Sequence, residues 1–127
     1  MTMSALQTGW TMEVDRGPDW LFVRLHPTAA TMEEGAELAA SLWALLEQHF
    51  TYRLVLELDQ LPILPSYLIG QFALLHKRIH THGGLLRLCG LSKENLQVLH
   101  RCRLDGLFCH YQDREAAVMG NHPPRPR

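Results

Sequence analysis

The run Tyr52-Arg53-Leu54-Val55-Leu56-Glu57-Leu58 has the character of a β-strand that is covered on both faces. It is short, rich in apolar residues and bounded by turn-like sequence, which is typical of an inner strand of a parallel sheet. We therefore expect this run to lie at the centre of a sheet, with the segments before and after it arranged around it.

Two short runs and an amphipathic segment precede this strand. Residues 11–14 and 20–25 are separated by a turn-like stretch, which predicts a hairpin-like pair of strands. Thr31-Met32-Glu33-Glu34 has the form of a capping box, so we expect a helix over residues 32–49. Its apolar stripe, which should cover one face of the sheet, is formed by Leu38, Leu42 and Leu45.

A second helix is predicted over residues 66–81, and Gly83-Gly84 supplies its left-handed stop. Its buried face is marked by apolar residues at helical spacing: Leu68, Phe72, Leu75 and Ile79. The remaining pattern predicts a strand at 85–89, a helix from the Ser92 cap to 103, a strand at 107–111 and a helix at 114–119. This alternation predicts an α/β fold with a mixed, largely parallel sheet of about five strands and about four helices.

Composition favours one globular domain in a chain of 127 residues. With 46% hydrophobic residues, 20% charged residues and a net charge of -1, neither disorder nor a basic nucleic-acid surface is expected. The boundaries we predict are a flexible N-terminus at residues 1–10, a domain at 11–119 and a disordered Pro-rich tail at 120–127.

Two observations concern the compartment. The three cysteines, Cys89, Cys102 and Cys109, lack the paired spacing of a zinc or redox motif, which fits a reducing environment. Met1 to Gln7 has neither the basic flank nor the apolar run of a signal peptide, and no later segment is long enough to span a bilayer. We expect a soluble, cytoplasmic protein.

The helix at residues 66–81 carries small residues on the face opposite its apolar stripe. Ser66, Gly70, Ala73 and Lys77 lie on this outward face. A mid-helix glycine costs about 1 kcal/mol relative to alanine, but small residues permit close approach of another backbone. Gly70 therefore serves either a partner contact or packing inside the domain.

Apolar groups flank this outward face. Tyr67 and Leu74 have the position of apolar anchors, and Pro62 and Pro65 stiffen the preceding loop. The loop at residues 61–64 is either a docking patch or the buried end of the central strand, and we expect partial burial. The predicted partner-binding surface consists of Pro62, Leu64, Pro65, Ser66, Tyr67, Gly70, Ala73, Leu74 and Lys77.

Motifs for catalysis are not visible in the sequence. It contains no Gly-rich phosphate loop, Gly-x-Ser-x-Gly elbow or His-Glu-x-x-His pattern, so we expect no enzymatic activity and no cofactor. His76, His80 and His82 are candidates for a zinc or nickel site, because two imidazoles on one helical face with a third nearby can bind these ions. The alternative is solvated histidines that complement the helix dipole.

The order of the predicted elements resembles the STAS fold, which anti-sigma factor antagonists share with the cytosolic parts of sulphate transporters. Three motifs carry the resemblance: Leu54-Val55-Leu56-Glu57-Leu58 is similar to the family's central strand, Gly83-Gly84-Leu85-Leu86-Arg87-Leu88-Cys89-Gly90 to the next strand, and Leu104-Asp105-Gly106-Leu107-Phe108 to a late turn. The resemblance implies a non-catalytic domain that binds an anti-sigma factor or a Bergerat-fold serine kinase, with a phosphatase as a further partner. ATP would belong to the kinase.

The resemblance also implies a role for Ser66. In phosphorylatable members the central strand leads to Asp-Ser-Ser-Gly at a helix start, and a partner kinase switches the first serine. The matching positions here are Pro65-Ser66-Tyr67-Leu68. Of the four motif residues, only the acceptor serine is retained, as Ser66. Ser66 is either a phosphorylation site or a plain capping hydroxyl. Two other functions stay open: a constitutive scaffold subunit of a signalling complex, and a small-ligand or metal-binding domain.

Overall fold

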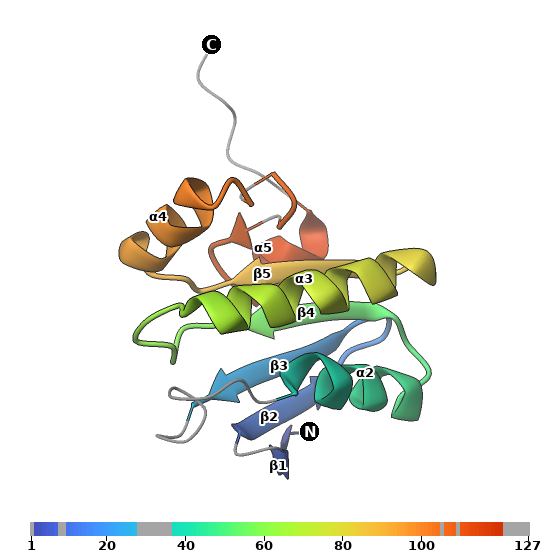
Figure 1. Cartoon of the computed structure of the whole chain (residues 1–127). Helices are drawn as coiled ribbons and strands as arrows, with labels where there is room; N and C mark the ends of the chain where they lie inside the picture. The colour runs from blue at the N-terminus through green and yellow to red at the C-terminus, as the bar shows by residue number, and fades with distance from the viewer. Residues whose placement is uncertain (1, 8–9, 28–36, 105, 109, 121–127) are drawn as a thin grey trace.

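The computed structural model describes residues 2–7, 10–27, 37–104, 106–108 and 110–120, which form a mixed sheet with helices on both faces (Figure 1). Its strand order is β1-β2-β3-β4-β5-β6. The strands are β1 Thr2–Gln7, β2 Trp10–Arg16, β3 Leu21–His26, β4 Arg53–Glu57, β5 Leu85–Cys89 and β6 His110–Tyr111. The helices are α2 Leu38–Gln48, α3 Ser66–Thr81, α4 Lys93–Arg101 and α5 Arg114–Met119.

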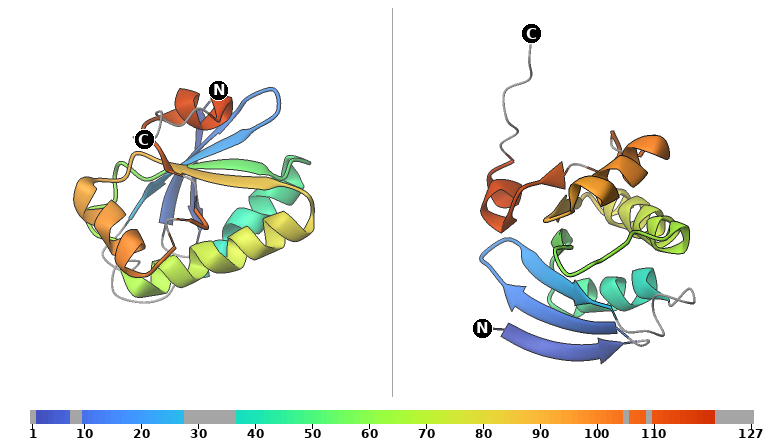
Figure 2. Two further views of the ribbon diagram at one scale, coloured as in Figure 1. Left: turned by 90° about the horizontal axis from the view of Figure 1, so that it is seen from above. Right: turned by 90° about the vertical axis from the view of Figure 1, so that its left-hand side faces the viewer.

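Strand β4 lies at the centre of the sheet, as predicted. It pairs in parallel with β3 on one side and with β5 on the other, whereas β1, β2 and β3 are antiparallel. Leu54 and Leu56 pack into the main core, which also holds the buried sides of α2 and α3. Val55 points the other way, into a smaller cluster with Trp20 and Tyr111. Helix α5 covers this second face (Figure 2), so β4 is buried on both sides.

The N-terminal segment is a correction to the sequence prediction. Residues 1–10 were expected to be flexible, but Thr2–Gln7 forms β1 and pairs antiparallel with β2 from Thr2↔Asp15 to Gln7↔Trp10. A short edge strand gains its backbone hydrogen bonds from the neighbouring strand and needs little apolar sequence of its own. The α/β fold class is confirmed, with six strands in the described sheet where about five were expected.

Two element boundaries also differ from the prediction. Helix α2 begins at Leu38 with Glu37 as its cap residue, and both the expected start at Met32 and the predicted capping box lie outside the described residues. Gln71 of α3 caps this end from outside the helix, because its Oε1 accepts a hydrogen bond of 2.9 Å from the Ala39 backbone. The predicted strand at 107–111 shortens to β6, since the backbone N–H groups of Leu107 and Phe108 both donate to the Leu104 carbonyl in a turn.

Glu57, the last residue of β4, is a buried carboxylate that joins three elements. Its side chain is 6% exposed and accepts hydrogen bonds from Arg114 of α5, at 2.6 Å to Oε1 and 3.3 Å to Oε2. Arg24 of β3 adds a bond of 3.1 Å. Arg114 also bonds Asp15 of β2 at 2.6 Å, and this hydrogen bond lowers the pKa of Asp15. Glu57 thus ties α5 to the sheet.

None of the helices in the described ranges combines the length and the apolar character needed to cross a membrane.

Candidate functional site

The predicted partner surface lies where the carboxyl ends of β3 and β4 meet the loop that leads into α3. In open α/β sheets, binding crevices form at the carboxyl ends of the strands. A depression of about 400 Å³ borders this edge and is lined by His26, Pro27, Asp59, Gln60, Leu61 and Pro62. The loop before α3 and the start of α3 therefore lie beside this depression.

Asp59 is a charged residue at this edge, next to the depression. Burial raises its pKa, but hydrogen bonds from Gln60 Nε2 and Arg24 Nε, each 3.0 Å long, outweigh burial, so the pKa of Asp59 is lowered. The carboxylate is thereby held in place next to the loop before α3.

The loop at residues 61–64 is partly buried, as expected. Leu61 and Leu64 belong to the core, and buried Asn95 of α4 donates a hydrogen bond of 3.3 Å to the Leu61 carbonyl. Leu64 is 5% exposed, so its predicted contact with a partner is wrong, because its side chain fills the core beneath the loop. Ile63, which the sequence analysis did not select, is 55% exposed. The apolar loop sequence does not by itself reveal which side chains point outward.

Ser66 is the first residue of α3, and its side chain is exposed. Pro65 is the cap residue, with φ -71° and ψ 155°, and the cap has no side-chain hydrogen bond. The interpretation of Ser66 as a capping hydroxyl is therefore wrong. The backbone N–H groups of Leu68 and Ile69 donate instead to the Pro65 carbonyl. The Ser66 hydroxyl lies at the positive end of the helix dipole, where an added negative charge is tolerated.

The outward face of α3 is open at Gly70. A Cβ built on Gly70 meets nothing within 4 Å, so packing inside the domain does not explain this glycine. Leu74 is 59% exposed, and Lys77 is exposed as well. Ala73 is half-buried against the core and lies at the margin of this face.

Tyr67 supports the surface from below. Its ring packs against the core, and burial raises the pKa of its hydroxyl. That hydroxyl is buried and has no hydrogen-bond partner among the described residues. Tyr67 is therefore less available as a contact anchor than the sequence suggested.

The exposed residues define what we call the α3 surface: Pro62, Ile63, Ser66, Gly70, Leu74 and Lys77. A groove of about 350 Å³ continues it between α2 and α3, lined by Glu37, Ala39, Ala40, Gln71, Leu74, Leu75 and Arg78. Exposed apolar side chains that adjoin a groove are typical of surfaces at which proteins contact one another.

Replacing Gly70 tests this interpretation. Gly70→Ala is expected to raise the free energy of unfolding by about 1 kcal/mol, since alanine is the better helix former and has open space around its Cβ. Urea unfolding of the wild type and the variant measures the change. Ala44→Gly on the exposed side of α2 is the matched control and should show a loss of similar size. A Gly70→Ala variant less stable than the wild type would mean that the glycine is needed for folding.

The three histidines considered as metal ligands do not converge. The rings of His76 and His80 stack with centroids 6.0 Å apart, and burial together with His80 lowers the pKa of His76. His82 instead packs against Trp43, with ring centroids 4.7 Å apart. Within the described part of the chain, no three His, Cys, Asp or Glu side chains form a group that could hold a metal ion.

The described thiols show no arrangement for nucleophilic chemistry. Burial, followed by the charge of Glu57, raises the pKa of Cys89 to about 12, so its thiol stays protonated. Cys102 is exposed at the end of α4, and Cys109 lies outside the described residues.

Comparison with solved structures shows the same fold in anti-sigma factor antagonists and in RsbS. An anti-sigma factor antagonist from Mycobacterium paratuberculosis superposes with a TM-score of 0.71 at 18% identity, covering 93% of this chain and 97% of that chain. A variant of RsbS from Moorella thermoacetica gives 0.70 at 12% identity, covering 86% and 92%. The anti-sigma factor antagonist SpoIIAA in its unphosphorylated form gives 0.65 at 14% identity, covering 88% and 99%. At these identities the likeness is one of fold.

The sequence itself carries the family assignment. No curated protein sequence matches the chain. A family model described as the STAS domain, however, matches residues 19–117, which contain β3 to β6, α2 to α4 and most of α5. The chain belongs to the STAS domain family.

Proposed function

We propose that this chain is a non-catalytic signalling protein of the anti-sigma factor antagonist type, which acts in the cytoplasm by binding a regulatory protein through the α3 surface. The partner is an anti-sigma factor or a Bergerat-fold serine kinase. The observation that carries the proposal is the exposed Ser66 hydroxyl. It makes no capping hydrogen bond to α3, and Ser66 is the first residue of the small-residue face of this helix. The fold likeness to anti-sigma factor antagonists supports the choice of partner class.

The mechanism is competition for the partner. While Ser66 is unmodified, Gly70 lets the partner backbone approach α3 closely, and Ile63 and Leu74 supply apolar contacts at the two ends of the surface. The domain thereby occupies the anti-sigma factor or kinase and releases whatever that partner restrains.

Phosphorylation of Ser66 is the proposed switch. A phosphate adds roughly two negative charges, and the amino end of α3 tolerates them without unfolding the domain. A partner packed over the same point would have to desolvate those charges, which weakens the complex. Pro65 replaces the acidic residue that precedes the acceptor in phosphorylatable relatives, so the cognate kinase would have to recognise a site that lacks this carboxylate.

Ser66→Glu places a permanent charge at this position. We expect it to bind a purified anti-sigma factor kinase from the source genome at least about tenfold more weakly than wild type, a loss of about 1.4 kcal/mol. Calorimetric titration measures the affinity. Ser66→Ala is the control and should bind like wild type, because the Ser66 hydroxyl has no hydrogen bond to lose among the described residues.

Two results separate the switch from the contact. If Ser66→Glu bound the kinase as tightly as wild type, the phosphorylation switch would be disproved, although the α3 surface could still be the contact. Intact-mass measurement after incubation with the kinase and ATP is the second test, since a constitutive scaffold subunit would gain no phosphate.

A further inference from the structure

Phe50 carries a large apolar side chain at a position where neither its exposure nor its backbone angle favours one. Its side chain is 88% exposed, although phenylalanine is among the residues most favoured by burial. Its φ is 53°, in the left-handed region where an L side chain is strained. An observed backbone outlier with an exposed aromatic ring is a reason to look for a function at that position.

The strain has a clear structural origin. At the end of α2, the Phe50 N–H donates to the Glu47 carbonyl and the Thr51 N–H donates to the Leu46 carbonyl, which closes the helix with a left-handed residue. Helix α3 ends with the same bonds but has Gly83, with φ 73°, at this position. Helix α4 uses Arg103 there, whose polar side chain extends into water. Of these three helices, only α2 has an exposed apolar side chain at the left-handed position that ends the helix.

The surroundings of Phe50 are basic and polar. A depression of about 480 Å³ is lined by Arg16, Pro18, Asp19, Phe50, Thr51, Tyr52, Arg53, His82, Gly83 and Gly84. Within the described part of the chain, Asp19 is the one acidic residue of this lining, and no carboxylate lies within ion-pair distance of Arg16 or Arg53. The Arg53 guanidinium lies 5.8 Å above the Trp20 ring, which holds it at the surface.

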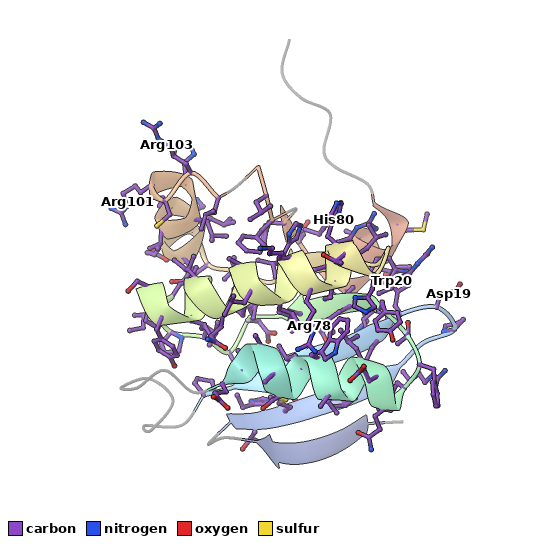
Figure 3. All side chains as sticks on the ribbon, turned by 45° about the vertical axis from the view of Figure 1, so that its right-hand side comes forward. Asp19, Trp20, Arg78, His80, Arg101 and Arg103 are labelled. Carbon is purple, nitrogen blue, oxygen red and sulfur yellow. The ribbon has the colours of Figure 1, made fainter. Side chains whose placement is uncertain are left out.

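This depression is far from Ser66, the proposed switch residue. Ser66 begins α3, and His82 follows its last residue, so about 24 Å of helix separates them at 1.5 Å per residue. Figure 3 shows Asp19 and Trp20 on the side of the molecule to which the end of α3 with His80 points, and Arg101 and Arg103 on the opposite side.

We propose that Phe50, Arg16, Arg53 and His82, which we call the Phe50 surface, form a second docking site for an acidic segment of a partner protein. Unpaired guanidinium groups match carboxylates through two parallel hydrogen bonds, and the Phe50 ring needs an apolar side chain from the same segment. Inorganic phosphate could bind the arginines, but it has no apolar group to cover the Phe50 ring, so a peptide segment fits the site better. A symmetric contact between two copies would bring the same arginines of both copies together.

This site goes beyond the proposed function and does not depend on it. One partner would bind at the start of α3, and another at the end where Phe50 lies. The domain would then join two proteins rather than occupy one.

The test uses the full chain, labelled with ¹⁵N, and the synthetic peptide acetyl-Glu-Leu-Glu-Glu-Leu-Glu-amide. We expect saturable amide shifts at Phe50, Thr51 and Arg53, and about tenfold weaker binding by Arg53→Glu, because the variant repels the peptide. The same peptide with lysine in place of glutamate should give no saturable shifts.

Phe50→Gly is the decisive variant. It should bind the acidic peptide about tenfold more weakly, yet melt about 3 °C higher than wild type, because glycine removes the left-handed strain. Met119→Ala, which shortens another exposed apolar side chain, should leave peptide binding unchanged.

Four results would overturn the proposal. The first is the absence of saturable shifts with the acidic peptide, and the second is binding that survives in Phe50→Gly. The third is binding of inorganic phosphate or AMP to the wild type as tight as that of the peptide. The fourth is Phe50-dependent dimerisation in sedimentation experiments, which would make this face an interface between copies of the chain.

Discussion

Glu57→Ala is expected to lower the free energy of unfolding by about 3 kcal/mol, the largest electrostatic effect we foresee in this chain. The carboxylate is almost fully buried and accepts from both Arg114 and Arg24. Removing it leaves two guanidinium groups without their shared acceptor. Because these arginines are 36% and 34% exposed, water can solvate them in part, so we choose the lower end of the range known for broken buried pairs.

Two variants separate charge from packing in this network. Glu57→Gln keeps the volume and one acceptor oxygen, so its loss should be intermediate. Asp59→Ala removes an exposed partner of the same Arg24 and should cost less than about 1 kcal/mol. Urea unfolding measures all three variants, and hydrogen exchange should show faster opening of α5 in Glu57→Ala. Equal losses of stability in Glu57→Ala and Asp59→Ala would show that burial does not increase the contribution of Glu57 to the free energy of unfolding.

The difference between Glu57 and its strand shows what local sequence can predict. The pattern of Tyr52–Leu58 was enough to identify β4, and helical spacing was enough to identify α3 over residues 66–81, because both signals lie within one element. The partners of Glu57 are 33 and 57 residues away in the chain. No periodicity reports such distant pairs, so the strand pattern shows Glu57 only as one residue of an apolar strand.

The candidate site shows the same limit. The sequence identified the outward face of α3 with Ser66 and Gly70, because a helical wheel needs only the spacing of residues. It assigned Leu64 to the contact surface and missed Ile63, since the direction of a loop side chain depends on backbone angles that are set by tertiary packing. Phe50 was missed for a related reason, because its left-handed φ replaces the glycine that usually marks such a helix end.

Gly84→Ala is expected to lower the free energy of unfolding by about 3 kcal/mol, whereas Gly83→Ala next to it should cost about 1 kcal/mol. A Cβ on Gly84 would lie 2.0 Å from the Tyr52 carbonyl oxygen and 2.9 Å from Ile79 Cγ2. The same oxygen accepts the Leu85 N–H at 3.0 Å, so relieving the clash would separate β5 from β4 at their first bond.

Gly83 is the matched control for this prediction. Its Cβ would meet nothing within 4 Å, and only its left-handed φ of 73° disfavours alanine. The two neighbouring glycines are therefore required for different reasons, one for its backbone angle and the other for the space between α3 and β4. Urea unfolding of the two variants distinguishes these reasons. Losses of equal size would mean that α3 shifts easily away from Tyr52, and the close contact at Gly84 would then not be what holds the end of α3 against the central strand.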